Sequence, residues 1–339
     1  MAKSVLGVEF GSSRIKICEV KNDAVVRFVK EDMPENIVVG GEVVAWEALA
    51  DFVGSVMKAN HFNTKQIHLV IPDTLTYTRR LTLPIMTAQQ LKVNLPYEFH
   101  DFISDDKDNY IYDYAVVSVM KDENGTETGL DVLGVAAAKD LIEHYVELFR
   151  SRRMKLVNAA PQCLAYGCLV QKIEPELADR DFIILDLGFS ATRINIFSQG
   201  IFDTTRTIEE GCQTLARRVA EILGCDEHIA ALHLVQNTNG VMDSEIIRDV
   251  CGQIAVDVMR AVNYYTYEKR DNTLETIYVC GGGALIPQLL AELRDSVPLE
   301  IVPLADLEDE HINADVLMNG PAAAGICWNG QRKQVARHE

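Results

Sequence analysis

The residues best suited to chemistry lie at two short turns, each beside a carboxylate. Asp186 follows four apolar residues, 182–185, and precedes a turn that opens at Gly188. Glu9 holds the same place before Gly11, near the start of the chain. Alternating apolar residues lead away from each turn, which is typical of the second strand of a hairpin. The sequence therefore predicts two similar β-hairpins, each with an acidic residue at its bend.

The two hairpins are expected to be copies that differ slightly in the turn. Ile15 and Ile17 of the first take the places of Ile194 and Ile196 in the second. The second copy is expected to have a loop one residue longer. Two such hairpins in one chain suggest two similar halves that face each other across a cleft.

Each turn suits the phosphates of a nucleotide. Glycine at the bend removes the side chain that would keep a phosphate from the backbone N–H groups. Small hydroxyls add donors, and these are Ser12, Ser13, Ser190 and Thr192. Because a carboxylate repels phosphate, Glu9 and Asp186 would instead hold Mg²⁺ through water or orient an attacking water. The alternative is that Asp and Gly simply form ordinary hairpin turns.

A third glycine-rich stretch follows a short β-branched strand, 276–280. It consists of Gly281, Gly282 and Gly283, after which residues 284–286 are expected to start a helix. Three glycines would let the backbone approach the base and ribose of a nucleoside. The stretch lacks the G-x-G-x-x-G spacing and the trailing acidic residue of a dinucleotide site. A plain tight turn from strand to helix is the alternative.

Composition limits the class of protein. The 339 residues, 48% of them hydrophobic, can bury two ordinary cores. A net charge of −18 argues against nonspecific binding to nucleic acid or to an anionic membrane. The first residues lack the apolar region of a signal peptide, and no apolar run is long enough to span a membrane. We therefore expect a cytoplasmic protein of two domains.

Cysteine and histidine usage indicates no disulfide framework and no metal cage. The eight cysteines form no C-x-x-C pair, and we expect them to be reduced packing residues. His228 and His233 lack the spacing and the partner carboxylate of a zinc helix.

Further elements are expected around the first hairpin. Residues 23–34 form a third strand, and 43–60 form an amphipathic helix. Region 66–139 contains strands, a helix interrupted at Pro96, and a turn at 124–125 between two strands. This region is expected to be a subdomain inserted into the first half.

The second half repeats the pattern of the first. A third strand leads to a helix over 212–223 that is stopped by Gly224. A longer helix follows Asp243, which we expect to be its N-cap. Small residues over 320–328 would let two helices cross closely, as a hinge between domains requires.

The order of these motifs resembles the actin-like ATPase superfamily, which includes actin, sugar kinases and heat-shock chaperones. Within it, the chain resembles the PilM family of type IV pilus assembly proteins, relatives of FtsA, over nearly its whole length. The distinctive parts are the hairpin with Glu9 and the stretches 83–99 and 132–165. The resemblance implies an α/β chain with an actin-like (ribonuclease H-like) duplicated two-domain ATPase fold and an inserted subdomain.

The resemblance also implies domain bounds. The first actin-like domain is expected over 1–157, with the inserted subdomain at about 66–153. The C-terminal segment 326–339 is expected to pack back on it. The second domain, over 158–325, carries the second phosphate hairpin and the adenosine motif.

By the same resemblance, the cofactors are ATP and Mg²⁺. Glu9 and Asp186 would hold Mg²⁺ through water, and Gln162 stands where actin-like ATPases often carry a polar residue near the γ-phosphate. The expected cofactor-binding residues are Gly11, Ser12, Ser13, Lys16, Gly188, Ser190, Thr192, Gly211, Gly281, Gly282 and Gly283. The superfamily commonly has Asp where Glu9 stands, so the carboxylate is displaced by about a bond length. We therefore expect ATP binding with at most slow hydrolysis.

The implied function is that of a cytoplasmic ATP-binding scaffold in the inner-membrane assembly platform of a type IV pilus. Its partners would be the short N-terminal peptide of a PilN-like membrane protein and other platform or motor proteins, with no nucleic acid. It would reach the membrane only through a partner, and homo-oligomerisation is left open. An FtsA-like filament former and a small-molecule kinase are the alternatives. The tail has too few apolar positions for the interfacial helix of FtsA.

Overall fold

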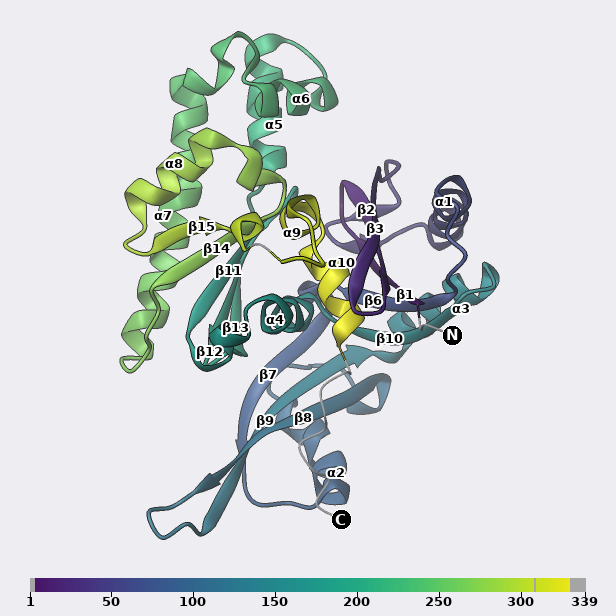
Figure 1. Cartoon of the computed structure of the whole chain (residues 1–339), viewed down its shortest axis with the longest axis vertical. Coiled ribbons are helices and arrows are strands. Elements are labelled where there is room, and N and C mark those ends of the chain that lie inside the picture. The colour runs from purple at the N-terminus through teal and green to yellow at the C-terminus, as the bar shows by residue number, and fades with distance from the viewer. Residues whose placement is uncertain (1–3, 308, 330–339) are drawn as a thin grey trace. The chain divides into compact units, whose positions relative to one another are not determined.

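The computed structural model describes residues 4–307 and 309–329, which fall into two compact units (Figure 1). Unit 1 comprises Met1–Cys168, Phe202–Thr204 and Ala322–Glu339, and unit 2 comprises Leu169–Ile201 and Thr205–Pro321. Of the segment 326–339, which was expected to pack back on the first domain, residues 330–339 lie outside the described residues.

Unit 1 is built on a five-stranded sheet of order β10-β6-β1-β2-β3. The strands are β1 (Ser4–Phe10), β2 (Arg14–Lys21), β3 (Ala24–Asp32), β6 (Gln66–Ile71) and β10 (Lys155–Pro161). Strands β1, β2 and β3 are antiparallel neighbours, whereas β6 runs parallel to β1 and to β10. Helices α1 (Trp46–Ala59) and α3 (Lys139–Ser151) supply apolar residues to the core, including Leu49 and Phe149. The short strands β4 (Val38–Val39) and β5 (Glu42–Val43) pair with each other.

Unit 2 repeats this sheet with the order β13-β12-β11-β14-β15. The strands are β11 (Phe182–Leu187), β12 (Thr192–Ser198), β13 (Ile201–Ile208), β14 (Thr276–Cys280) and β15 (Glu300–Pro303). As in unit 1, the first two strands are antiparallel and the following two are parallel to the first. The same strand order in both units bears out the expected duplication.

Helices fill the core of unit 2 and connect its strands. They are α5 (Cys212–Leu223), α6 (Glu227–Gln236), α7 (Glu245–Glu268), α8 (Pro287–Ser296) and α9 (Ala314–Asn319). Leu215 of α5, Ile254 of α7 and Leu289 of α8 are buried in one core with β11 and β14. Gly224 ends α5 in the left-handed conformation at φ 61°, as its position predicted. Helices α4 (Gln162–Ile173) and α10 (Pro321–Gly325) span the boundaries between the units.

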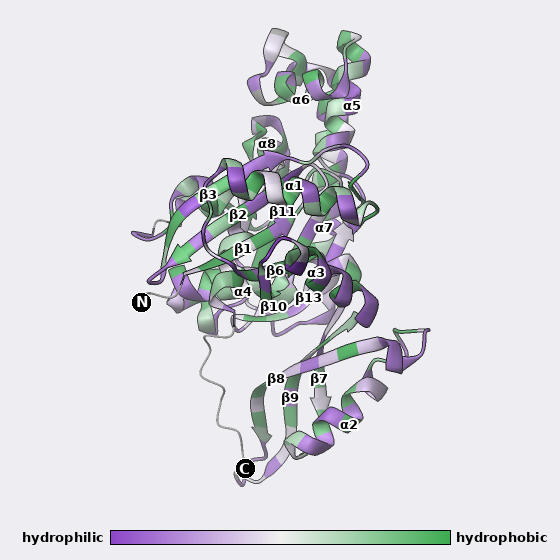
Figure 2. Cartoon of the chain, turned by 90° about the vertical axis from the view of Figure 1, so that its right-hand side faces the viewer, coloured by the Kyte–Doolittle hydropathy of each residue, from purple (hydrophilic) through white to green (hydrophobic). Residues whose placement is uncertain are grey.

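A smaller sheet in unit 1, of order β7-β9-β8, corresponds to the expected insertion. It consists of β7 (Thr76–Leu83), β8 (Tyr110–Lys121) and β9 (Glu127–Ala138), and α2 (Ala88–Glu98) lies along one of its faces (Figures 1 and 2). The sheet and helix thus occupy 76–138 rather than 66–153. The reason is that β6 is a central strand of the main sheet and α3 packs on that sheet's core.

Three helix boundaries differ from the sequence-based expectation. Pro96 lies inside α2, in its last turn, and does not interrupt the helix. Ser244, not Asp243, is the N-cap of α7, because Asp243 belongs to a preceding 3₁₀ turn. Gly282–Leu285 also form a 3₁₀ turn, so α8 begins only at Pro287, a residue suited to the first turn of a helix.

No helix among residues 4–307 and 309–329 combines the length and the apolar character needed to cross a membrane.

Candidate functional site

The first hairpin holds its carboxylate in a buried ion pair. Glu9 lies opposite Lys16 in the register of β1 and β2, and the loop is closed by a hydrogen bond from Gly11 N to Arg14 O at 2.9 Å. Glu9 is only 6% exposed. Lys16 Nζ donates to Glu9 Oε1 at 2.6 Å, whereas Glu9 Oε2 is buried without a hydrogen-bond partner among the described residues. One oxygen of this carboxylate is therefore left to accept.

The second hairpin has the same backbone geometry. Asp186 lies opposite Arg193, and Gly188 N donates to Ala191 O at 3.1 Å. A Cβ on Gly188 would lie 2.7 Å from Ala191 O, and one on Gly11 would lie 2.9 Å from Arg14 O. Both turns therefore require glycine, because a side chain would meet the backbone of its own loop.

The strand bounds leave three residues, 11–13, in the first loop and four, 188–191, in the second, as expected, yet the pairing register of the two hairpins is the same. In both hairpins seven positions separate the acidic residue from the basic residue opposite it. Ile17, and not Ile15, is the counterpart of Ile194, because Ile17 pairs with Val8 as Ile194 pairs with Leu185. The alternating apolar pattern reads equally well after a shift of two residues, so only the hydrogen-bonded register fixes the alignment.

The three consecutive glycines approach the carboxylate of the second hairpin. Gly281 has φ 88°, and a Cβ there would lie 2.6 Å from Asp186 Oδ1 and 2.7 Å from Leu187 O. A Cβ on Gly283 would lie 2.7 Å from Leu187 Cβ. Gly282 is exposed, and nothing lies within 4 Å of its Cβ position. The first and third glycines thus allow close packing, while the second leaves open space.

Gly211 lies against the loop of the second hairpin. A Cβ there would lie 2.5 Å from Phe189 O and 2.7 Å from Gly188 O. The first N–H groups of α5 donate to the same loop, from Cys212 to Gly188 O at 3.0 Å and from Gln213 to Phe189 O at 2.8 Å. The start of α5 therefore holds the loop in place.

The thiol of Cys212 lies beside this loop and titrates far from its ordinary range. Burial chiefly, and then the negative charge of Asp186, raises the pKa of Cys212 to about 12. The thiol stays protonated near neutral pH. The described cysteines form no disulfide with one another.

The remaining predicted residues differ in their surroundings. Gln162 is 6% exposed, and its Nε2 donates to Tyr166 Oη at 2.9 Å within α4. Ser12, Ser13 and Ser190 are half-buried on the loops, whereas Thr192 is 1% exposed. The expected nearness of Gln162 to a γ-phosphate stays a prediction, as do the cofactor-binding roles of these hydroxyls.

Within each unit, the structure brings several predicted residues together. Unit 1 groups Glu9, Gly11 and Lys16 at one hairpin. Unit 2 groups the predicted residues Asp186, Gly188, Gly211, Gly281 and Gly283. Arg193 was not among the predicted residues, although the equal spacing from Glu9 to Lys16 and from Asp186 to Arg193 was a signal for it.

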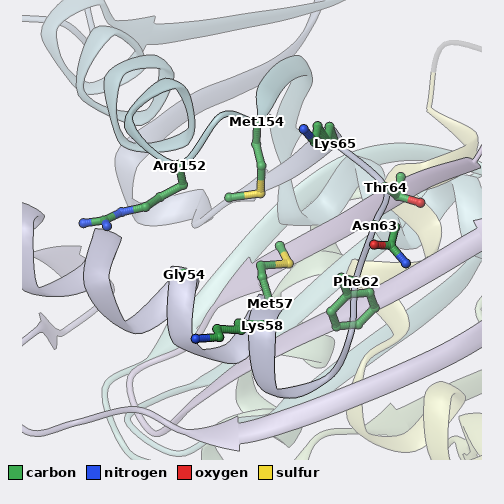
Figure 3. Close-up of a pocket in the computed structure, with 9 residues that line it drawn as sticks. All are labelled: Gly54, Met57, Lys58, Phe62, Asn63, Thr64, Lys65, Arg152 and Met154. Carbon is green, nitrogen blue, oxygen red and sulfur yellow. The ribbon is translucent and has the colours of Figure 1, made fainter.

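A separate pocket of about 290 Å³ opens in unit 1 (Figure 3). Its lining combines basic and apolar side chains, including Lys58, Lys65, Arg152, Met57, Phe62 and Met154. Residues 62–65 and 152–154 immediately precede β6 and β10. Glu9 pairs with Val70, near the opposite ends of these parallel strands. The pocket is therefore remote from the Glu9 hairpin.

Comparisons with known proteins identify the fold. A family model described as type IV pilus assembly protein PilM matches residues 7–316. A chain of the PilM-PilN type IV pilus biogenesis complex is 19% identical, with 96% of both chains covered and a TM-score of 0.78. The ethanolamine utilization protein EutJ from Carboxydothermus hydrogenoformans is 15% identical, with 96% of this chain and 90% of that chain covered and a TM-score of 0.59.

A third similar structure carries a nucleotide. MreB5 of Spiroplasma citri bound to ADP is 11% identical, with 93% of this chain and 94% of that chain covered and a TM-score of 0.50. Together these likenesses confirm the expected actin-like ATPase fold.

Proposed function

This chain belongs to the PilM family of type IV pilus assembly proteins, and on that premise we propose that it is an ATP-binding scaffold of the pilus assembly platform. The observation that carries the nucleotide part is the repetition of one turn geometry around two buried acidic residues, Glu9 and Asp186. A single such turn is common in proteins, whereas two in duplicated sheets fit the paired phosphate hairpins of an actin-like ATPase fold. The ADP bound to MreB5 supports the same role for this fold.

The residues present fit Mg·ATP. The buried Oε2 of Glu9, which lacks a hydrogen-bond partner among the described residues, suits a water of a hydrated Mg²⁺. Gly11 and Gly188 would let phosphate oxygens approach the two loops. Gly282, open on its Cβ side, would accept the adenosine. Bound Mg·ATP would supply contacts that stabilise one arrangement of the protein over another.

Hydrolysis would be slow at most. Lys16 holds Glu9 Oε1 at 2.6 Å, so this carboxylate is already engaged on one side. Glu also places its carboxylate farther along the side chain than Asp does, and hydrolysis depends on accurate placement of the attacking water. ATP would therefore serve mainly as a ligand.

The partner would be the N-terminal cytoplasmic peptide of a PilN-like inner-membrane protein. The similar solved chain comes from a PilM-PilN complex. The inserted subdomain of this chain exposes several large apolar side chains, namely Ile85, Val93, Tyr97 and Phe102. Such side chains suit the capture of a short apolar peptide. Binding there would bring the protein to the membrane through its partner.

Peptide binding with and without nucleotide tests this function. A fluorescently labelled peptide from the PilN-like protein is titrated with the full chain, in the absence and presence of saturating Mg·ATP. We expect binding in both cases and a change in affinity when ATP is present. Val93→Asp on α2 should weaken binding, whereas Val26→Asp, at another exposed valine, on β3, should not. No binding to the peptide would refute the scaffold role, and an affinity indifferent to ATP would refute the coupling.

A further inference from the structure

Each hairpin has one buried polar atom without a hydrogen-bond partner among the described residues, and the two atoms differ in kind. In the first, the orphan atom is an acceptor, Glu9 Oε2. In the second, it is a donor, the buried Nε of Arg193. A buried donor of a charged group costs free energy when it makes no hydrogen bond. Proteins tolerate such a cost mainly at sites where a ligand or an ordered water completes the pairing.

Arg193 is directed at the loop of its own hairpin. It pairs in register with Asp186, so both side chains lie on the same face of the sheet. One terminal nitrogen, Nη1, lies 3.9 Å from the position that a Cβ on Gly188 would take. The counterpart in unit 1 behaves differently, because Lys16 closes on Glu9 at 2.6 Å. The guanidinium therefore lies over the glycine that opens the loop.

We infer that Arg193 is a phosphate-binding residue of the second hairpin. This inference rests on the proposed function, and it names the chemistry of one contact: a guanidinium fork that takes a phosphate of the bound nucleotide. Arginine suits this task because its planar donors match two phosphate oxygens at once. It would also offset the charge of Asp186 in a protein of net charge −18, where an incoming polyphosphate otherwise meets repulsion.

The two hairpins would then offer opposite chemistry, each within its own unit. The first offers a carboxylate oxygen, which suits the hydrated cation. The second offers a guanidinium, which suits the anion.

Calorimetric titration of matched variants tests the inference. Mg·ATP, Mg·ADP and adenosine are titrated into the wild type, Arg193→Gln and Arg193→Lys, with Arg260→Gln as a control on the exposed side of α7. Loss of a charge-assisted contact should weaken Mg·ATP and Mg·ADP roughly 10- to 100-fold in Arg193→Gln, and less in Arg193→Lys. Adenosine affinity should stay unchanged in all variants.

Unfolding without ligand separates binding from a structural role. Arg193→Gln should leave the unliganded protein as stable as the wild type or more stable, because it removes a buried donor that lacks a partner. If Arg193→Gln instead lowers that stability and binds Mg·ATP like the wild type, Arg193 is structural and the inference is wrong. If the wild type itself fails to bind Mg·ATP, the proposed function is wrong, which is a distinct result.

Discussion

The two hairpins share their strand register and turn geometry, but they differ in where the basic side chain lies relative to the acidic residue opposite it. In unit 1, Lys16 donates to Glu9 Oε1, and Glu9 Oε2 has no hydrogen-bond donor among the described residues. In unit 2, Arg193 lies over Gly188, and its Nε is left to donate. The difference teaches that a duplicated backbone can keep its geometry while its side chains take on complementary chemistry.

The strands that carry these hairpins also differ in what packs against them. Gly7 of β1 has no room for a side chain, since a Cβ would lie 1.8 Å from Ala323 O of α10. The register makes Ile184 its counterpart in β11, and this side chain is fully buried. A close helix contact therefore replaces side-chain packing in unit 1. The small residue Ala323 serves that contact, although the element it meets is a strand and not the second helix that was expected.

The largest expected effect comes from the glycine beside Asp186. Gly281→Ala should lower the free energy of unfolding by about 3 kcal/mol or more, because φ 88° is strained for alanine and the new Cβ meets Asp186 and Leu187. Its counterpart in unit 1 is Ile71, so the requirement for glycine is particular to unit 2. Gly282→Ala, whose Cβ meets open space, should change stability by less than about 0.5 kcal/mol. Urea unfolding of both variants measures the difference, and equal losses would refute the close contact with Asp186.

The next effect contrasts the two basic residues. Lys16→Met should cost about 2–4 kcal/mol of unfolding free energy, because it leaves the buried Glu9 carboxylate without its cation. Arg193→Met should cost far less, since Arg193 Nε has no partner to lose among the described residues. Adding Glu9→Gln to Lys16→Met should recover part of the loss. Thermal and urea unfolding of the wild type and the three variants give the comparison, and equal losses in the two single variants would refute it.

The smallest effect probes the field of Asp186 at the second hairpin. Burial chiefly, and then the Asp186 charge, raises the pKa of Cys212 to about 12, so at pH 8 roughly one thiol in ten thousand is ionised. Removing the negative charge in Asp186→Asn lowers this pKa and increases the thiolate fraction at fixed pH. Alkylation by iodoacetamide, followed by mass spectrometry, should therefore become a few-fold faster at Cys212.

Cys251 is the control for this measurement. Burial also raises the pKa of Cys251 to about 12, but the carboxylate that adds to its shift is Glu292 rather than Asp186. Its alkylation rate should stay the same in Asp186→Asn. A parallel rise at both cysteines would indicate general loosening of unit 2 instead of a local charge effect.

Much of the fold could be predicted from local patterns. Alternating apolar residues and turn glycines identified both hairpins, and Gly224 marked the end of α5. The bounds of the inserted subdomain could not be predicted. In sequence, β6 resembles the strands of the insertion, and it differs from them only in the strands with which it pairs. The helix α6 and the strand β15 were missed for the same reason, since each depends on tertiary packing.

The candidate site was predictable in residue types but not in contacts. Asp186 and Gly281 were both expected to matter, yet their separation is a property of the parallel register between β11 and β14. Gly211 was expected to touch the cofactor, whereas its tightest contacts are with the hairpin loop. The placement of the basic residue in each hairpin could not be predicted. No sequence pattern distinguishes a basic side chain that pairs with the carboxylate opposite it, as Lys16 does, from one that lies near the loop glycine, as Arg193 does.

The most direct test of the account is calorimetric titration of Mg·ATP into the wild type, Glu9→Gln, Asp186→Asn and the double variant. The account predicts one tight site in the wild type, weaker binding in each single variant and none in the double variant. At about one hundred times the dissociation constant, Mg·ATP should add roughly 2.7 kcal/mol to the unfolding free energy of the wild type. A wild type that binds no ATP, or a double variant that binds it as tightly as the wild type, would contradict the claim that the acidic residues of the two hairpins take part in nucleotide binding.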